Sequence, residues 1–108
     1  MNQEIKALHD LEYGHVLMPS ELINNAKLPN YEYVKFSSSP KGLVAECMCV
    51  LEDETRAIFN YYFDDKDRLM KLTAVQGTNV ETLFDRKDEI SKLRMQLCSL
   101  DKTPQTTG

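Results

Sequence analysis

The sequence predicts one α+β domain: N-terminal helices, a four-stranded antiparallel β-meander and a long C-terminal helix packed on the sheet. Three observations lead to this fold class. The chain has 108 residues, about the length of one domain. Apolar residues recur at spacings of three and four near both ends, and at every second position in the middle. The segments between the predicted strands are short, and short connections join antiparallel neighbours.

Two helices are expected before the sheet. In residues 2–12, the spacing of Ile5, Leu8 and Leu11 predicts an amphipathic helix with one apolar face. Residues 19–27 predict a shorter helix, because the segment begins with a proline, which suits the first helical turn, followed by serine and glutamate.

Four strands are expected at residues 31–37, 43–51, 55–63 and 69–76. The serine- and proline-containing loop after the first strand and the acidic turns after the second and third are typical of hairpin connections. Strand 43–51 is apolar on nearly both faces, which predicts an interior position in the sheet rather than an edge.

A long helix is expected over residues 79–99. Thr78 and Glu81 form the capping-box pattern that begins many helices. Residues 101–108 are polar and predict a flexible tail, so residues 1–100 form the single domain. The apolar residues expected on one stripe of the helix are Val80, Leu83, Phe84, Ile90, Leu93, Leu97 and Leu100.

The composition indicates which class of partner and which cellular compartment to expect. The net charge is −4 and the lysines and arginines are not clustered, which argues against nucleic acid as a partner. Residues 1–20 hold no continuous apolar segment, so neither a secretory signal nor a membrane anchor is expected there. An odd number of cysteines without a secretory signal indicates reduced thiols, and we therefore expect a cytoplasmic location.

The cysteines and histidines offer no recognisable metal or catalytic set. Cys47 and Cys49 are two positions apart in a predicted strand, Cys98 lies in the predicted helix, and no fourth ligand is evident. His9 and His15 match no ligand or nucleophile–base spacing. We therefore expect the strand cysteines to be small core residues, with no catalytic, cofactor-binding or metal-binding residue in the chain.

Two other segments resemble sites only superficially. The acidic run of Asp64, Asp65 and Asp67 lacks the glycine and glutamate positions of an EF-hand, and fits a hairpin turn better. Residues 37–42 contain serines, a lysine and a glycine, but no helix follows them as a phosphate-binding loop would require.

The predicted sheet has more apolar surface than one helix can cover. Phe59, Tyr61 and Phe63 share one face and are expected in the core. The opposite face needs a cover from the N-terminal helices or from a partner, and it carries Val44, Met48, Val50, Ile58 and Tyr62.

These features favour a non-enzymatic protein-binding module: an adaptor, specialised chaperone, inhibitor or immunity-type protein. The alternative is a small-molecule-binding domain or small enzyme with a pocket between the sheet and the C-terminal helix, lined by Tyr33, Tyr61 and the cysteines. No cofactor is expected, and the partner would be another protein or a second copy of the chain. The expected partner-binding residues are Ile90, Leu93, Met95, Leu97, Cys98, Tyr62 and Met48.

The C-terminal helix supports either of two interpretations. Its main stripe has the spacing of a coiled-coil seam, but packing against the chain's own sheet is the more common use of such a stripe. Met95 and Cys98 form a second apolar strip, which a helix with one buried face does not need. This second strip favours association with another chain.

Overall fold

The computed structural model describes the backbone of residues 2–106 and the side chains of residues 3 and 5–98. Its elements are α1 (Asn2–Tyr13), α2 (Pro19–Asn25), β1 (Tyr31–Ser39), β2 (Gly42–Val50), β3 (Arg56–Phe63), β4 (Leu69–Gln76), β5 (Asn79–Asp85) and α3 (Arg86–Thr106). The strands form one antiparallel sheet in the order β1-β2-β3-β4-β5, so every strand pairs with its neighbour in sequence. The predicted α+β class and meander are confirmed, and β2 is an interior strand as expected.

The sheet has five strands rather than four, and the prediction of a helix beginning at position 79 is wrong. Asn79–Asp85 is β5, and α3 begins at Arg86. Gly77, with φ +58°, turns the chain so that Gln76 pairs with Asn79. Val80, Leu83 and Phe84 fit helical spacing, but the exposed edge of β4 offers this segment a strand partner. Pairing along β4 outweighs the local capping-box signal.

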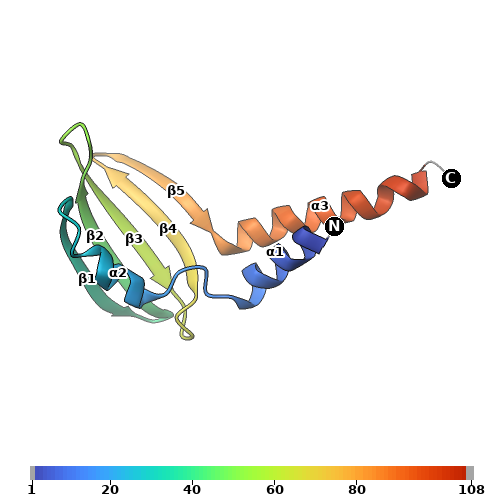
Figure 1. Cartoon of the computed structure of the whole chain (residues 1–108), viewed down its shortest axis with the longest axis horizontal. Coiled ribbons are helices and arrows are strands. Elements are labelled where there is room, and N and C mark those ends of the chain that lie inside the picture. The colour runs from blue at the N-terminus through green and yellow to red at the C-terminus, as the bar shows by residue number, and fades with distance from the viewer. Residues whose placement is uncertain (1, 107–108) are drawn as a thin grey trace.

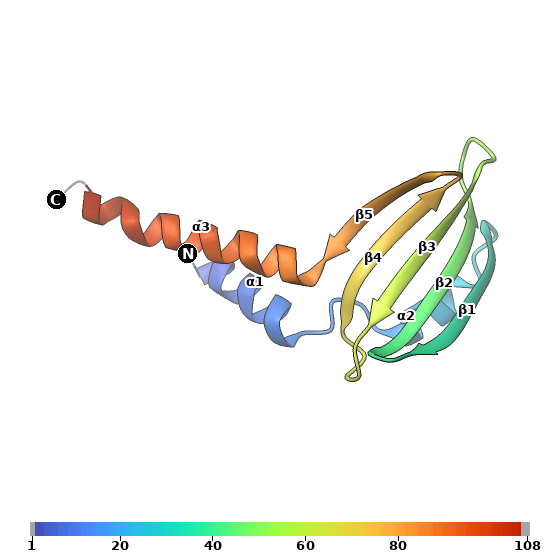
Figure 2. The same ribbon diagram turned by 180° about the vertical axis from the view of Figure 1, so that it is seen from behind.

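The hydrophobic core lies on one face of the sheet, and α2 covers it. Leu22 of α2 is fully buried against Ala45, Cys47 and Cys49 of β2. Figure 1 shows α2 over this face near β1 and β2, and Figure 2 shows it behind the sheet in the opposite view. Phe63 is buried in the same cluster, with Phe59 and Tyr61 packed against it, so the predicted core face is confirmed.

The long helix contacts β4 and β5, but most of its described contacts are with α1. Figures 1 and 2 show α1 and α3 side by side, leading away from the β5 edge of the sheet. We call this pair the helical arm. It gives the molecule an elongated shape, 59 × 32 × 24 Å. The predicted packing of the C-terminal helix on the sheet is confirmed, and it occurs at β4 and β5.

The predicted polar tail, residues 101–108, overlaps the end of α3. The backbone is helical as far as Thr106. The last two residues of that tail, 107 and 108, lie outside the described residues.

Arg86 joins the arm to the sheet. Its side chain is 2% exposed and donates hydrogen bonds to the carbonyl oxygens of Leu69, at 2.8 Å, and His15, at 3.1 Å. A further guanidinium N–H donates to the carbonyl oxygen of Leu11 at the end of α1. Burial lowers the pKa of this guanidinium from its ordinary value, and nearby Arg68 acts in the same direction. One side chain thus connects α1, the α1–α2 loop, β4 and α3.

Candidate functional site

No helix covers the second face of the sheet within the described part of the chain, and we call it the helix-free face (Figure 2). The strand register places one residue from each strand in a row across it. Tyr33 pairs with Met48, Met48 with Ile58, Ile58 with Val75, and Val75 with Val80. All five carry an apolar or aromatic side chain, and we call them the apolar row.

The apolar row becomes more accessible towards β5. Met48, Ile58 and Val75 are half-buried between their neighbours, whereas Val80 is 65% exposed on the edge strand. Such a surface would release water on contact with another apolar surface, and burial of apolar area is the main favourable term in most associations. The row is therefore able to bind a chain that brings its own apolar side chains.

A polar row lies next to the apolar one and limits its width. It crosses the sheet through Lys35, Glu46, Asn60, Thr73 and Thr82. The hydroxyl of Tyr33 donates a 2.6 Å hydrogen bond to the Glu46 carboxylate. This bond raises the pKa of the Tyr33 hydroxyl and fixes one end of the apolar row.

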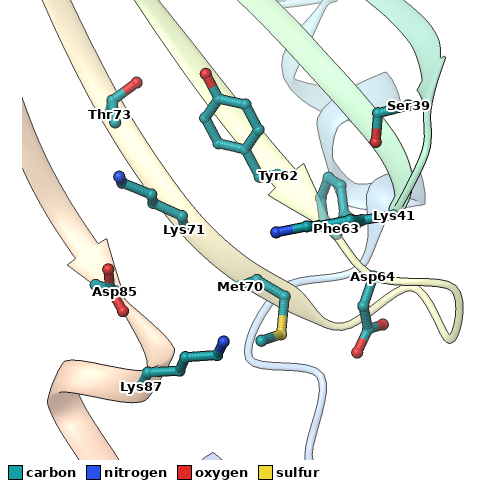
Figure 3. A pocket seen from close by; sticks show the side chains of 10 residues that line it. All are labelled: Ser39, Lys41, Tyr62, Phe63, Asp64, Met70, Lys71, Thr73, Asp85 and Lys87. Atoms are coloured by element: carbon teal, nitrogen blue, oxygen red, sulfur yellow. The ribbon is translucent and has the colours of Figure 1, made fainter.

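A cavity of about 450 Å³ opens at the end of the helix-free face where α3 begins. Figure 3 shows Tyr62 and Met70 in its wall, with Lys41, Lys71 and Lys87 around it. The three lysines come from the β1–β2 turn, from β4 and from the first turn of α3. The remaining lining residues are Ser39, Phe63, Asp64, Thr73 and Asp85.

Both aspartates of the cavity have structural roles. Asp64 forms an ion pair with Arg68 at 2.7 Å and accepts hydrogen bonds from the backbone N–H groups of Lys66 and Arg68. Partial burial opposes ionisation of Asp64, but these bonds outweigh it and lower the pKa of the carboxyl. Asp85 accepts a 3.2 Å hydrogen bond from the backbone N–H of Asp88 in the first turn of α3. The lysines of the cavity form no ion pair with any carboxylate among the described side chains.

The seven residues predicted to bind a partner fall on two surfaces. Met48 and Tyr62 lie on the helix-free face, where Tyr62 is 39% exposed. The other five lie on the arm, where Ile90, Leu93 and Leu97 are half-buried while Met95, 71% exposed, and Cys98 face solvent. The side chain of Leu100, expected on the same stripe, lies outside the described residues.

The predicted core role of the strand cysteines is confirmed. Cys47 and Cys49 are buried under α2, and Cys98 is a third free thiol on the arm. Burial raises the pKa of the Cys47 thiol to about 11, and it raises that of Cys49 as well. Tyr61 also faces this core, whereas Tyr33 lies on the helix-free face. Tyr33, Tyr61 and the cysteines, which the alternative prediction placed around one pocket, therefore do not line a common pocket.

Both histidines are exposed, and their rings lie near a tyrosine ring and a backbone carbonyl group. The ring of His9 lies 5.0 Å from that of Tyr13, centre to centre, and an imidazole nitrogen of His15 lies 3.2 Å from the carbonyl oxygen of Lys66. Asp64, Asp65 and Asp67 lie in the β3–β4 turn, as predicted. Among the described side chains, no group of three or more histidines, cysteines and acidic residues is placed to hold a metal ion.

In the described part of the chain, no helix is both long enough and apolar enough to cross a membrane. Comparison with protein-family models, with curated proteins and with solved structures gave no match to the chain.

Sequence reasoning missed part of the apolar row and the whole cavity. Val80 falls in the segment predicted as a helix, and Val75 lies in a predicted strand whose partner on the β5 side is not predicted. The β-branched residues Val80 and Thr82, two positions apart, are a usable signal for a strand. The lysines of the cavity are 16 to 46 positions apart in sequence, so only the sheet register brings them together.

Proposed function

We propose that the chain is a non-enzymatic protein-binding module that binds another polypeptide on its helix-free face. It would be an adaptor, specialised chaperone, inhibitor or immunity-type protein, acting in the cytoplasm. The observation that carries this proposal is the apolar row, which crosses all five strands and has no covering helix among residues 2–106.

The position of the row on the sheet supports a polypeptide partner. The row ends at β5, an edge strand with unpaired backbone groups on its outer side. A bound chain could therefore place apolar side chains over Val75 and Val80 and use the edge of β5 for backbone hydrogen bonds. Burying a side chain of this size contributes roughly 1.5–3 kcal/mol at most, so several contacts are needed for stable binding.

The test compares two charge substitutions in the full chain. Val80→Lys places a charge at the exposed end of the apolar row. Ile23→Lys places the same charge at a residue of α2 that is 56% exposed and belongs to another element. Tagged wild type and both variants are used to capture proteins from native lysate, and each captured protein is identified by mass spectrometry and then purified to measure its affinity.

The proposal requires one captured protein whose affinity falls at least tenfold in Val80→Lys and is unchanged in Ile23→Lys. Circular dichroism and melting curves establish that both variants remain folded. Equal affinity of the two variants for every captured protein would contradict a binding role for the helix-free face.

The cavity favours a second candidate, a small-molecule-binding domain. It lies beside the start of α3, is lined by other residues than the alternative prediction named, and its volume of about 450 Å³ is large enough for a small ligand. Thermal-shift measurements with a panel of small organic acids and phosphates test it. A ligand that stabilises the wild type but not Lys71→Gln would support this candidate, and no stabilisation by any panel member would count against it.

A further inference from the structure

The cavity and the apolar row belong to one continuous surface. Tyr62 and Lys71 pair with each other across β3 and β4, and both line the cavity. In β3 the apolar row passes through Ile58, four positions from Tyr62. Four residues of a strand span roughly 13 Å. A chain bound over the apolar row can therefore reach the cavity with a side chain only a few residues further along.

The charge around the cavity differs from that of the whole molecule. The chain carries a net charge of −4, yet this end of the sheet places three lysines around one hollow. In Figure 3, Lys41 and Lys87 extend towards Met70 from opposite sides, and Lys71 lies on the strand between them. The two aspartates nearby are held by Arg68 and by the first turn of α3.

The lining also suits a side chain with an apolar stem. Phe63 is buried, and Met70 and Tyr62 present apolar surface between the lysines. A glutamate bound there would pack its methylene groups against Met70 and Tyr62 while its carboxylate approached an ammonium group. The volume of the cavity allows more than one such side chain.

We propose that the cavity binds acidic side chains of the polypeptide that occupies the helix-free face. This inference rests on the proposed function and adds to it the chemistry of the partner: an apolar segment with acidic residues roughly 13 Å from its apolar anchor. Lys41, Lys71 and Lys87 would supply the charge, and Asn60 and Thr73 of the polar row would separate the acidic site from the apolar row.

The test uses acetylated tetraglutamate amide and the matching tetraglutamine peptide as probes of the full chain. Amide chemical shifts are followed by NMR during titration. Tetraglutamate should shift the signals of residues around the cavity, and added salt should weaken its binding, while tetraglutamine should have no effect. The triple variant Lys41→Gln, Lys71→Gln, Lys87→Gln should bind tetraglutamate about tenfold more weakly, because each exposed charge pair contributes little alone.

The control is a second triple variant, Lys6→Gln, Lys27→Gln, Lys92→Gln, which changes the net charge equally at exposed positions elsewhere. Equal loss of binding in both triple variants, or no shift with tetraglutamate, would overturn the inference. Tighter binding of inorganic phosphate or citrate than of tetraglutamate would also overturn it, in favour of a small-molecule site. Tetraglutamate binding that persists in Val80→Lys would support the cavity site even if the proposed partner binding failed.

Discussion

Arg86 is a buried cation whose acceptors are backbone carbonyl groups. A buried charge is costly unless hydrogen bonds replace its water, and the carbonyl groups of Leu11, His15 and Leu69 do so here. The arginine is also needed by these acceptors, which come from three different segments. It therefore acts as a connection between segments rather than as a surface charge.

Replacing this arginine should destabilise the fold. Arg86→Met keeps much of the side-chain volume but leaves the carbonyl groups without their donor, so the free energy of unfolding should fall by roughly 2–3 kcal/mol. Urea denaturation measures the change. The control is Arg56→Met, which removes an exposed ion pair with Glu32 and should cost under about 1 kcal/mol. Equal losses in the two variants would mean that Arg86 has no special structural role.

Because the thiol of Cys47 is buried, we expect the chain to lose stability at alkaline pH. Its pKa is about 11 in the folded chain against an ordinary value of 9.0, so the unfolded chain releases this proton first. The contribution of this group to stability is therefore constant below about pH 9 and falls as the pH rises towards 11, by up to roughly 2 kcal/mol. Urea midpoints between pH 8 and pH 10.5 measure the slope.

A substitution tests whether this pH dependence of stability comes from Cys47. Cys47→Ala should make the stability of the chain less sensitive to pH in this range, although Cys49 and Tyr61 still contribute because their pKa values are also raised. Cys98→Ala removes an exposed thiol and should leave the slope unchanged. A slope that is the same in all three proteins would contradict this assignment.

At the scale of elements, β5 depends on the turn that Gly77 makes. Its φ of +58° lies in the left-handed region, and no atom lies within 4 Å of the position where a Cβ would be. The cost of a side chain is therefore conformational rather than steric. Gly77→Ala should lower the free energy of unfolding by about 1 kcal/mol, and Gly77→Asn by less, because asparagine tolerates this conformation better. Urea denaturation of both variants tests this order, and the reverse order would argue against the turn.

We predict that the chain associates with a second copy through the helical arm. Met95 is exposed on α3 while the main stripe is half-buried, so the second apolar strip has no described cover within the chain. We expect the wild type to form a dimer at micromolar concentration in sedimentation experiments. Met95→Glu should dissociate it without changing the melting temperature.

The matched control for that experiment is Gln96→Glu, which adds the same charge at an exposed position one residue further along α3. The dimer should persist in this variant. A wild type that is strictly monomeric would exclude self-association through the arm, and unfolding of Met95→Glu would show that Met95 belongs to the core instead.

For the whole molecule, we expect the fold to need neither metal nor disulfide. Its three cysteines are free thiols, and the core cluster is built from apolar side chains of α2 and the sheet. A chelator and a reductant added together should leave the melting curve unchanged. A decrease of more than a few degrees would show that a metal or a disulfide stabilises the chain.

The sequence predicted the elements whose signals are local. Residues 69–76 were predicted as a strand and form β4 with the same bounds, and α1 and α2 differ from their predicted bounds by no more than two residues. The error at β5 arose because residues 78–84 satisfy helical and strand patterns at once, and only pairing with β4 decides between them. The sequence also could not predict which helix covers which face of the sheet, because that depends on where α2 and α3 pack.

The pairing of α1 with α3 has a consequence for the order of folding. Each strand of the sheet can pair as soon as its neighbour in sequence is available, so hairpins can form early over short loops. The partner of α1 is separated from it by the entire sheet, and Arg86 bonds to a carbonyl 75 residues earlier. During synthesis on a ribosome, α1 emerges before α3, and its apolar face has no partner helix until α3 is released. We therefore expect docking of the arm to be a late kinetic step, during which a chaperone could bind α1.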